Sequence, residues 1–302
     1  MPHAPFIPPV EELRLSKGTF VVSIDFELTW GLWDYADLAA EKLVVAKERM
    51  VVTRLLELFD RYDIRTTWAT VGALFDKIPP EKKLIDAWYA PELVEKIRDN
   101  RVDHELATHT YAHVYFQEIP SQEAAADLSQ ARQVHAESQY PFASIVFPRN
   151  QVAHLDVIAN SGLRVFRSVD AGLLGWSIYR APRLRPVLNL AGKMVPSPAP
   201  TVLPRRHGNG LIELPSSMLL LGRNGIRKVI RPAVMVTKIR SSLAVAAARR
   251  RMFHLWFHPS NFYHDTDTQF AILERGLRTA AKMRDRGYID IRTMGDFANE
   301  AA

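Results

Sequence analysis

The chain has 302 residues, of which 47% are hydrophobic and 24% charged, and it contains no cysteine. This length and composition are typical of one large α/β domain or two smaller ones. The lack of cysteine excludes disulfides and thiolate metal sites, so any metal would be held by histidines and carboxylates. The N-terminal residues show no signal-peptide pattern, and no apolar run approaches the roughly 20 residues of a membrane span. We therefore expect a cytoplasmic protein.

Strand-like and helix-like stretches alternate along the chain. Residues 1–17 are rich in proline and then charged, and we expect them to form an arm over a domain spanning residues 18–302. Strands are predicted at residues 19–24, 64–72, 105–108, 143–147, 163–169, 211–214, 251–258 and 289–292. Helices are predicted at residues 41–62, 91–100, 121–139, 152–161, 223–250 (interrupted at Pro232) and 268–286. The alternation predicts a mostly parallel sheet or barrel in one domain.

Two carboxylates, Asp25 and Glu27, follow the first predicted strand. Because side chains alternate across a strand, both are expected on the same face. In an α/β barrel, the carboxyl ends of the strands form the mouth where active sites lie. An acidic turn without chemistry is the alternative for this stretch taken alone.

Two histidines, His109 and His113, follow the third predicted strand. Their spacing of four residues lets both imidazoles meet on one side of a turn and bind one divalent ion. Two histidines with one carboxylate would leave positions open for water and substrate. Arg149 follows the next strand and is expected to pair with an acid at the mouth, where Asp25 and Glu27 are available.

The stretch 253–260 carries a further histidine at a predicted strand end. His258 shares a face with His254 and Trp256 by alternation, and it lies next to a proline. His254 lies deeper in the strand, where an interior hydrogen-bonded role is expected.

These stretches together resemble the polysaccharide deacetylase family, the NodB-homology amide hydrolases. Family members have an acidic motif, a His-Thr-x-x-His motif, an arginine–proline motif and a Leu-x-His motif, in that order. Here the corresponding stretches are Asp25-Phe26-Glu27, His109-Thr110-Tyr111-Ala112-His113, Pro148-Arg149-Asn150 and Trp256-Phe257-His258. The resemblance runs from about residue 20 to residue 292, and it implies a distorted (β/α) barrel.

The resemblance also implies a metal-dependent hydrolase. Glu27, His109 and His113 would hold a divalent ion, zinc first, with cobalt, nickel or manganese as alternatives. Asp25 would be the base, and Arg149 would hold it in place. His258 would be the acid that protonates the departing amine. Because Phe26 separates two acids that are adjacent aspartates in much of the family, the reverse roles for Asp25 and Glu27 stay open.

Further residues are expected to contact substrate. Trp30 follows the acidic motif and would either stack on a sugar ring or pack a loop. Asn150 belongs to the arginine motif, and Trp256 stands where the family has a leucine lining the acyl pocket. Glu213 either faces the site, supporting an arginine or His258, or is a surface carboxylate.

Positive charge is concentrated in one part of the chain. Between Asp170 and Asp265, Glu213 is the only acidic residue. This excess of basic residues suggests an anionic partner: a sugar phosphate, a lipid-linked glycan or the inner membrane face. Arg223, Arg227 and Arg231 would form one stripe on a helix, which is typical of an interfacial segment. A solvated basic surface is the alternative, and no nucleic-acid motif accompanies the charge.

The sequence therefore predicts removal of an N-acyl group, first of all N-acetyl, from a sugar in an intracellular glycan or glycan precursor. Two alternatives stay open. One is an allantoinase-like amide hydrolase that acts on a small ring amide. The other is a catalytically silent glycan- or lipid-binding relative, which the combination of Asp25, Arg149 and His258 argues against. The sequence gives no prediction of oligomeric state.

Overall fold

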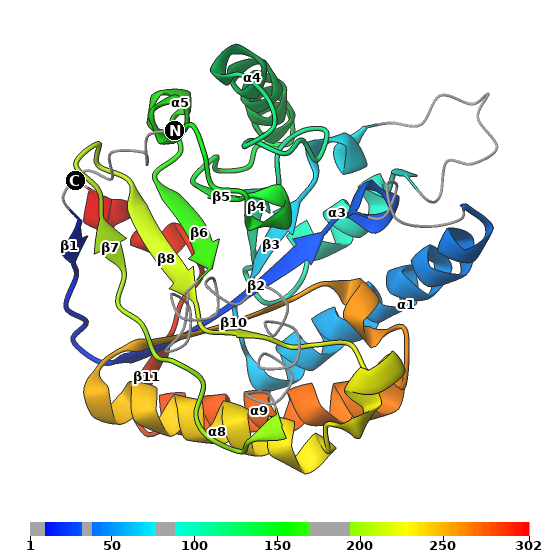
Figure 1. Cartoon of the computed structure of the whole chain (residues 1–302), viewed down its shortest axis with the longest axis vertical. Coiled ribbons are helices and arrows are strands. Elements are labelled where there is room, and N and C mark those ends of the chain that lie inside the picture. The colour runs from blue at the N-terminus through cyan, green and yellow to red at the C-terminus, as the bar shows by residue number, and fades with distance from the viewer. Residues whose placement is uncertain (1–9, 32–37, 77–87, 170–193, 302) are drawn as a thin grey trace, which may run out of the picture.

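The computed structural model describes residues 10–31, 38–76, 88–169 and 194–301. Strands occupy the centre of the molecule, and helices surround them (Figure 1). Neighbouring strands pair in parallel in the order β10, β2, β3, β4, β5, β6. Their bounds are β2 Gly18–Phe26, β3 Thr67–Thr70, β4 Glu105–Thr108, β5 Ser144–Val146, β6 Val165–Val169 and β10 Met252–Phe257.

The two edges of this sheet are joined by one stretch of chain. Strand β8 (Ile212–Ser216) pairs in parallel with β6, and β9 (Met218–Leu219) pairs in parallel with β10. Only Ser217 separates β8 from β9, and its N–H donates to the carbonyl of His254 at 2.9 Å. The sheet therefore closes into an irregular barrel, which confirms the predicted fold class.

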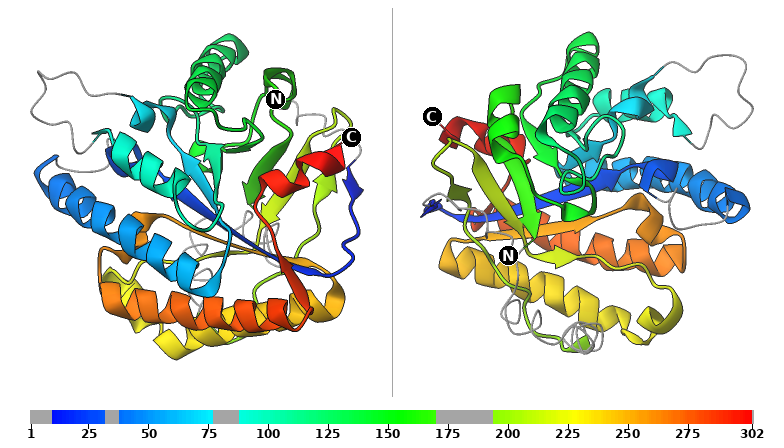
Figure 2. Two further views of the ribbon diagram at one scale, coloured as in Figure 1. Left: turned by 180° about the vertical axis from the view of Figure 1, so that it is seen from behind. Right: turned by 45° about the horizontal axis from the view of Figure 1, so that its top comes forward.

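Helices cover the outside of the barrel. Helices α8 and α9 lie side by side along one flank, and α4 and α5 lie on the opposite one (Figures 1 and 2). The helix bounds are α1 Leu38–Tyr62, α3 Pro91–Arg98, α4 Ser121–Glu137, α5 Leu155–Ser161, α8 Pro232–Arg249 and α9 Thr266–Asp285. The 3-10 turns are η1 Leu28–Gly31, η2 Gly72–Phe75, η3 Pro148–Asn150, η4 Gly225–Val229, η5 Pro259–Phe262 and η6 Gly295–Ala301.

Three short strands extend the sheet. Strand β11 (Ile289–Ile291) pairs in parallel with the start of β2. Strands β1 (Glu11–Glu12) and β7 (Arg205–Arg206) are antiparallel to each other, and β7 is antiparallel to β8. Part of the expected N-terminal arm thus pairs with the edge of the sheet.

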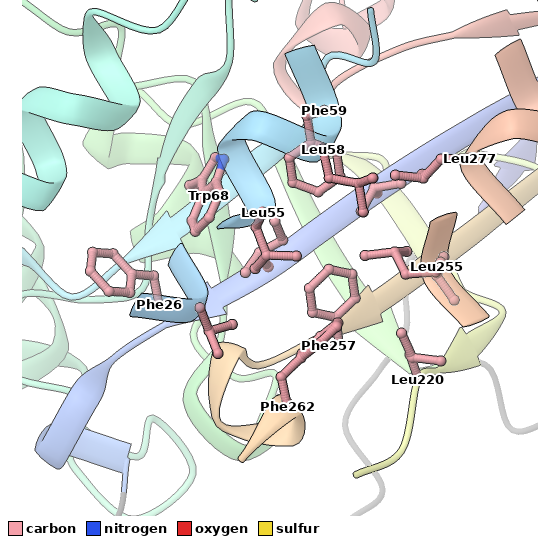
Figure 3. Packing of buried hydrophobic residues seen from close by; sticks show 14 of the residues in the cluster. Phe26, Leu55, Leu58, Phe59, Trp68, Leu220, Leu255, Phe257, Phe262 and Leu277 are labelled. Carbon is pink, nitrogen blue, oxygen red and sulfur yellow. The ribbon is translucent and has the colours of Figure 1, made fainter. Parts of the chain in front are cut away.

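Strand β2 is buried along its whole length, and its side chains alternate between two environments. Phe20, Ile24 and their alternate neighbours join the core between the barrel wall and the helices. Figure 3 shows this core, in which side chains from α1, β3 and β10 pack together. Val21 belongs instead to the cluster inside the barrel. Asp25 lies four residues further along β2, so alternation directs its carboxylate inward.

The predicted helix 223–250 is wrong in its first part. Residues 225–229 form the separate turn η4, and α8 starts at Pro232, which is favourable at a first helical position because it lacks an N–H. Arg223, Arg227 and Arg231 therefore do not form one helical stripe. The basic residues at 180, 183, 185 and 193 lie outside the described residues. Among the described helices, none is long and apolar enough to cross a membrane.

Candidate active site

Asp25 and Glu27 lie together at the end of β2. The His258 Nε2 atom lies 3.5 Å from an oxygen of Asp25 and 3.4 Å from an oxygen of Glu27. His258 directly follows β10, the parallel neighbour of β2, so the ends of two adjacent strands bring all three side chains to one place. About a quarter of the His258 side chain is exposed, whereas Asp25 is almost fully buried. The site is thus reached from the His258 side.

Glu27, His109 and His113 form a compact group of donors that could hold a metal ion. The Nε2 atoms of His109 and His113 lie 3.1 and 3.0 Å from the same oxygen of Glu27. One donor atom from each of the three residues lies within 4.8 Å of the others, and all three residues are buried. Two imidazoles with one carboxylate are a suitable donor set for a divalent cation such as zinc. The residues present therefore fit the implied metal.

Backbone contacts orient these donors. The Nδ1 atom of His109 lies 2.7 Å from the carbonyl oxygen of Val146; a proton on Nδ1 donates there and leaves Nε2 free to bind a metal. His113 has a left-handed backbone with φ of 55°. Asp127 of α4 fixes the turn before it by accepting the N–H groups of residues 111 and 112 at 2.8 and 3.0 Å.

Two further features shape the Glu27 carboxylate. Burial alone would raise its pKa, but the neighbouring imidazoles of His258, His109 and His113 hold the pKa well below its ordinary value. Gly31 packs against the same side chain, because a β-carbon at that position would stand 2.0 Å from Oε1 of Glu27. The carboxylate therefore stays ionised and has no room to move towards η1.

Asp25 is held by Arg167, which the sequence analysis missed. The two Nη atoms of Arg167 donate to the two oxygens of Asp25 at 2.6 and 2.7 Å, and both side chains are buried. Burial would raise the pKa of Asp25, but Arg167 and His258 bring it below its ordinary value. Such a two-pronged pair fixes both the charge and the orientation of the carboxylate.

The prediction that Arg149 holds Asp25 is wrong. Arg149 lies in η3, beyond the end of β5, with a left-handed φ of 52°. Its side chain is exposed, and its guanidinium lies over the ring of Tyr115 at 4.4 Å. Its neighbour Asn150 instead accepts a hydrogen bond from Arg167 at 3.1 Å. Asn150 of the arginine motif thus contacts Asp25 only indirectly, through Arg167.

The rest of the inner wall supports Arg167. Ser23 accepts from Arg167 at 3.0 Å, and its hydroxyl lies 2.8 Å from Nε2 of His254. Burial and the neighbouring arginine lower the pKa of His254 to about 3, so this histidine is neutral, as its expected interior role requires. The ring of Trp256 lies 4.3 Å from the Arg167 guanidinium and 5.7 Å from the His258 ring.

Trp30 packs against Trp88, which lies in a different segment of the chain, just before α3. Its indole N–H donates to the carbonyl of Trp88 at 2.8 Å, and the two rings meet edge to face with centroids 5.1 Å apart. The structure therefore shows the packing role. Contact between Trp30 and a sugar stays a prediction.

Glu213 lies on the outer face of the barrel wall. It pairs in register with Phe166, which packs in the core beneath α4 and α5. Its carboxylate lies 2.8 Å from Nε2 of His207 and 3.4 Å from Arg205, and it accepts from Ser168. The expectation that Glu213 faces the active site is wrong, because alternation along β8 turns it outward.

The comparisons with known proteins agree with this architecture. The polysaccharide deacetylase family model matches residues 42–151. No curated protein matches the sequence. A protein named as a polysaccharide deacetylase from Mycobacterium smegmatis has a TM-score of 0.65 at 14% identity, covering 98% of this chain and 94% of that one.

Two other solved structures are nearly as similar. The allantoinase PuuE has a TM-score of 0.62 at 12% identity, and a protein named as a polysaccharide deacetylase from Pseudomonas aeruginosa has 0.61 at 12%. In both comparisons 93% of this chain and 89% of the other are covered. At this identity the likeness shows the fold. The match over residues 42–151 and the shared barrel confirm the resemblance to the polysaccharide deacetylase family.

Proposed function

We propose that this chain is a metal-dependent hydrolase that removes an N-acyl group, first of all N-acetyl, from a sugar in an intracellular glycan or glycan precursor. The observation that carries the proposal is the placement of one ionised carboxylate, Asp25, beside a separate group of metal-binding donors. Glu27 is the carboxylate of that group, and His258 lies within 3.5 Å of both acids. This division supports Asp25 as the base and Glu27 as a metal ligand.

The residues have complementary parts in amide hydrolysis. A divalent cation held by Glu27, His109 and His113 would supply Lewis acidity, which polarises a carbonyl and acidifies water. Asp25 accepts the proton of the attacking water, and Arg167 keeps Asp25 ionised before that transfer. His258 donates a proton to the amide nitrogen, which is a poor leaving group until protonated.

We assign the neighbouring residues to positioning and substrate contact. Asn150 orients Arg167 through its side-chain oxygen. Trp256 lies beside His258 and is half-buried, so it offers a ring face for an acyl group or a sugar. Trp30 is a weaker candidate for sugar contact, because its N–H already binds Trp88.

The test combines metal analysis with an assay of acetate release from N-acetylated sugars. Wild type should contain one divalent ion per chain and release acetate. His113→Ala should lose both metal and activity with the fold intact by circular dichroism. His154→Ala is the matched control, because His154 lies outside the site and contacts the carbonyl of residue 119. It should keep both.

Three results would overturn the proposal. Full metal content in His113→Ala would mean that the assigned site is wrong. Hydrolysis of cyclic amides such as allantoin, without acetate release from any sugar, would favour the allantoinase-like alternative. Absence of any turnover by the metal-loaded protein would favour the silent binding protein.

A further inference from the structure

The segment 224–231, here called the η4 turn, carries two large aliphatic side chains in the open. Residues 224–229 are all exposed. Ile226 and Val229 are 69% and 52% exposed, which places them among the most exposed large hydrophobic residues of the described chain. Exposed aliphatic side chains that lie together on one turn often mark a surface that contacts a membrane or another protein.

The same turn is strongly basic. It contains Arg227, Lys228 and Arg231, and none of these forms an ion pair within the described part of the chain. Arg227 makes a side-chain hydrogen bond of 3.4 Å to Asn224, which leaves its charge uncompensated. No acidic residue occurs anywhere from residue 214 to residue 264. The turn therefore combines exposed aliphatic groups with a net positive charge, although Asp265 lies near Arg223 and Lys228.

Both ends of the turn are fixed to the body of the protein. Arg223 donates to the carbonyl of Ile230 at 2.8 Å, so one side chain ties the start of the turn to its end. Arg223 also forms an ion pair of 2.7 Å with Asp265, just before α9. Ile230 is buried in the core. The aliphatic groups are thus displayed on a closed, anchored turn.

The turn lies on the active-site side of the barrel. It follows β9, whose residue Leu219 pairs with Trp256, two residues before His258. Gly222 then passes against η5, since a β-carbon there would lie 3.1 Å from the carbonyl oxygen of Asn261. Segments that follow barrel strands surround the mouth. In Figure 1 the η4 turn is the yellow segment before α8.

We propose that the η4 turn binds the surface of an anionic lipid bilayer. Ile226 and Val229 enter the headgroup–acyl boundary, and Arg227, Lys228 and Arg231 lie among the headgroups. A bilayer matches both halves of this chemistry, because apolar insertion and attraction to anionic lipid act together. A soluble polyanion would use the cations and leave the aliphatic groups exposed. Given the proposed function, the mouth would then face sugars on membrane-anchored carriers.

The experiment is co-sedimentation of the full chain with vesicles of phosphatidylcholine, alone or mixed with phosphatidylglycerol, at low salt. Wild type should bind the mixed vesicles and bind more weakly as salt rises. Arg227→Gln/Lys228→Gln/Arg231→Gln should weaken binding about a hundredfold, given the usual contribution of each basic residue near anionic lipid. Ile226→Ser/Val229→Ser should weaken it about tenfold or more.

Two matched controls separate this turn from general charge and apolarity. Arg275→Gln/Lys282→Gln/Arg286→Gln removes the same charge from a groove between α8 and α9. Met50→Ser/Tyr288→Ser removes two other exposed hydrophobic groups. Both controls should bind vesicles within about twofold of wild type, as expected for changes outside the binding surface.

The proposal is overturned if wild type does not bind the mixed vesicles. It is also overturned if the control variants lose as much binding as the η4 variants do. Turnover of a soluble N-acetylated sugar should be unchanged in the η4 variants, because none of the substituted residues belongs to the catalytic group. Vesicle binding by a protein that hydrolyses no amide would sustain this surface while refuting the proposed function.

Discussion

Strand β6 places two neighbouring side chains on opposite faces of the barrel wall, and polar residues gather around each. On the inside, Arg167 holds Asp25, with Ser23 and His254 beside it. We call these four residues the inner cluster. On the outside, Ser168 donates to Glu213, which also contacts Arg205 and His207. These four residues are the outer cluster.

The two clusters share the features usually taken as signs of an active site. In each, burial would raise the pKa of the carboxyl, and basic or hydrogen-bonding neighbours lower it below the ordinary value. Shifted pKa values mark functional sites and structural networks alike. The difference is convergence: only Asp25 lies beside a metal-binding donor set and within 3.5 Å of a half-buried histidine, His258. The meeting of several reactive groups at one place, more than the pKa shift, identifies the candidate site.

The largest expected effect comes from removing the inner arginine. Arg167→Met leaves the buried Asp25 carboxylate without its partner, which typically costs about 3–5 kcal/mol of unfolding free energy. Turnover should be lost as well. Urea unfolding and the acetate assay measure the two effects. Adding Asp25→Asn should restore part of the stability and none of the turnover.

Arg149→Met is the matched control for Arg167→Met. Arg149 is exposed, and surface substitutions are usually within about 0.5 kcal/mol of wild type. Equal losses of stability in the two variants would contradict the assignment of Asp25 to Arg167.

The next effect concerns the proton-transfer pair. Asp25→Asn and His258→Ala should each lower turnover by roughly 10²-fold or more, the usual range for acid–base groups. Metal content should stay near wild type in His258→Ala, because His258 is outside the donor group Glu27, His109 and His113. If both variants turn over normally, the acid–base roles belong to other residues.

A smaller effect is expected from the outer cluster. Glu213→Gln removes a charged acceptor from His207 and Ser168, and we expect a loss of about 1–3 kcal/mol of unfolding free energy. Turnover at saturating substrate should remain within about twofold of wild type, since a stability effect alone leaves the chemical step unchanged. A tenfold fall in turnover of the folded variant would show that the two faces of the wall are coupled.

The smallest expected effect is the pH dependence of the loss of unfolding free energy in Glu213→Gln. Because the pKa of Glu213 is lower in the folded chain than its ordinary value of 4.5, its ionisation stabilises the fold above pH 4.5. This contribution disappears as the pH falls through the folded-state pKa. The gap in unfolding free energy between wild type and Glu213→Gln should therefore be widest near pH 7 and narrow below pH 4.5. A gap that widens in acid would reverse the assigned sign.

Local patterns in the sequence were enough to predict which side chains, Glu27, His109 and His113, the structure brings together as possible metal ligands. Asp25 and Glu27 are separated by one residue at a strand end, and His109 and His113 by three, so each pair is positioned by its own segment. Most helix and strand positions followed from periodicity for the same reason. The prediction of one helix over residues 223–250 was wrong because Pro232 starts a new helix rather than interrupting one.

The partner of Asp25 could not be found in this way. Arg167 has no motif, and its role depends on pairing between β5 and β6 and on closure of the barrel. The available signal was an arginine at the centre of Val-Phe-Arg-Ser-Val, where a buried charge demands a carboxylate. Glu213 was misplaced because the inward face of β8 is set by its register with β6.

The pairing of β2 with β10 also determines when the candidate site is completed during synthesis. Thr19 and Met252 are register partners, so the first long strand finds this neighbour only after most of the chain has left the ribosome. Contacts this distant in sequence are slow to form, and an unpaired hydrophobic strand is prone to aggregate meanwhile. A nascent chain that ends before residue 252 also lacks His258. We therefore expect newly made protein to depend on chaperones until residues 252–258 have been translated.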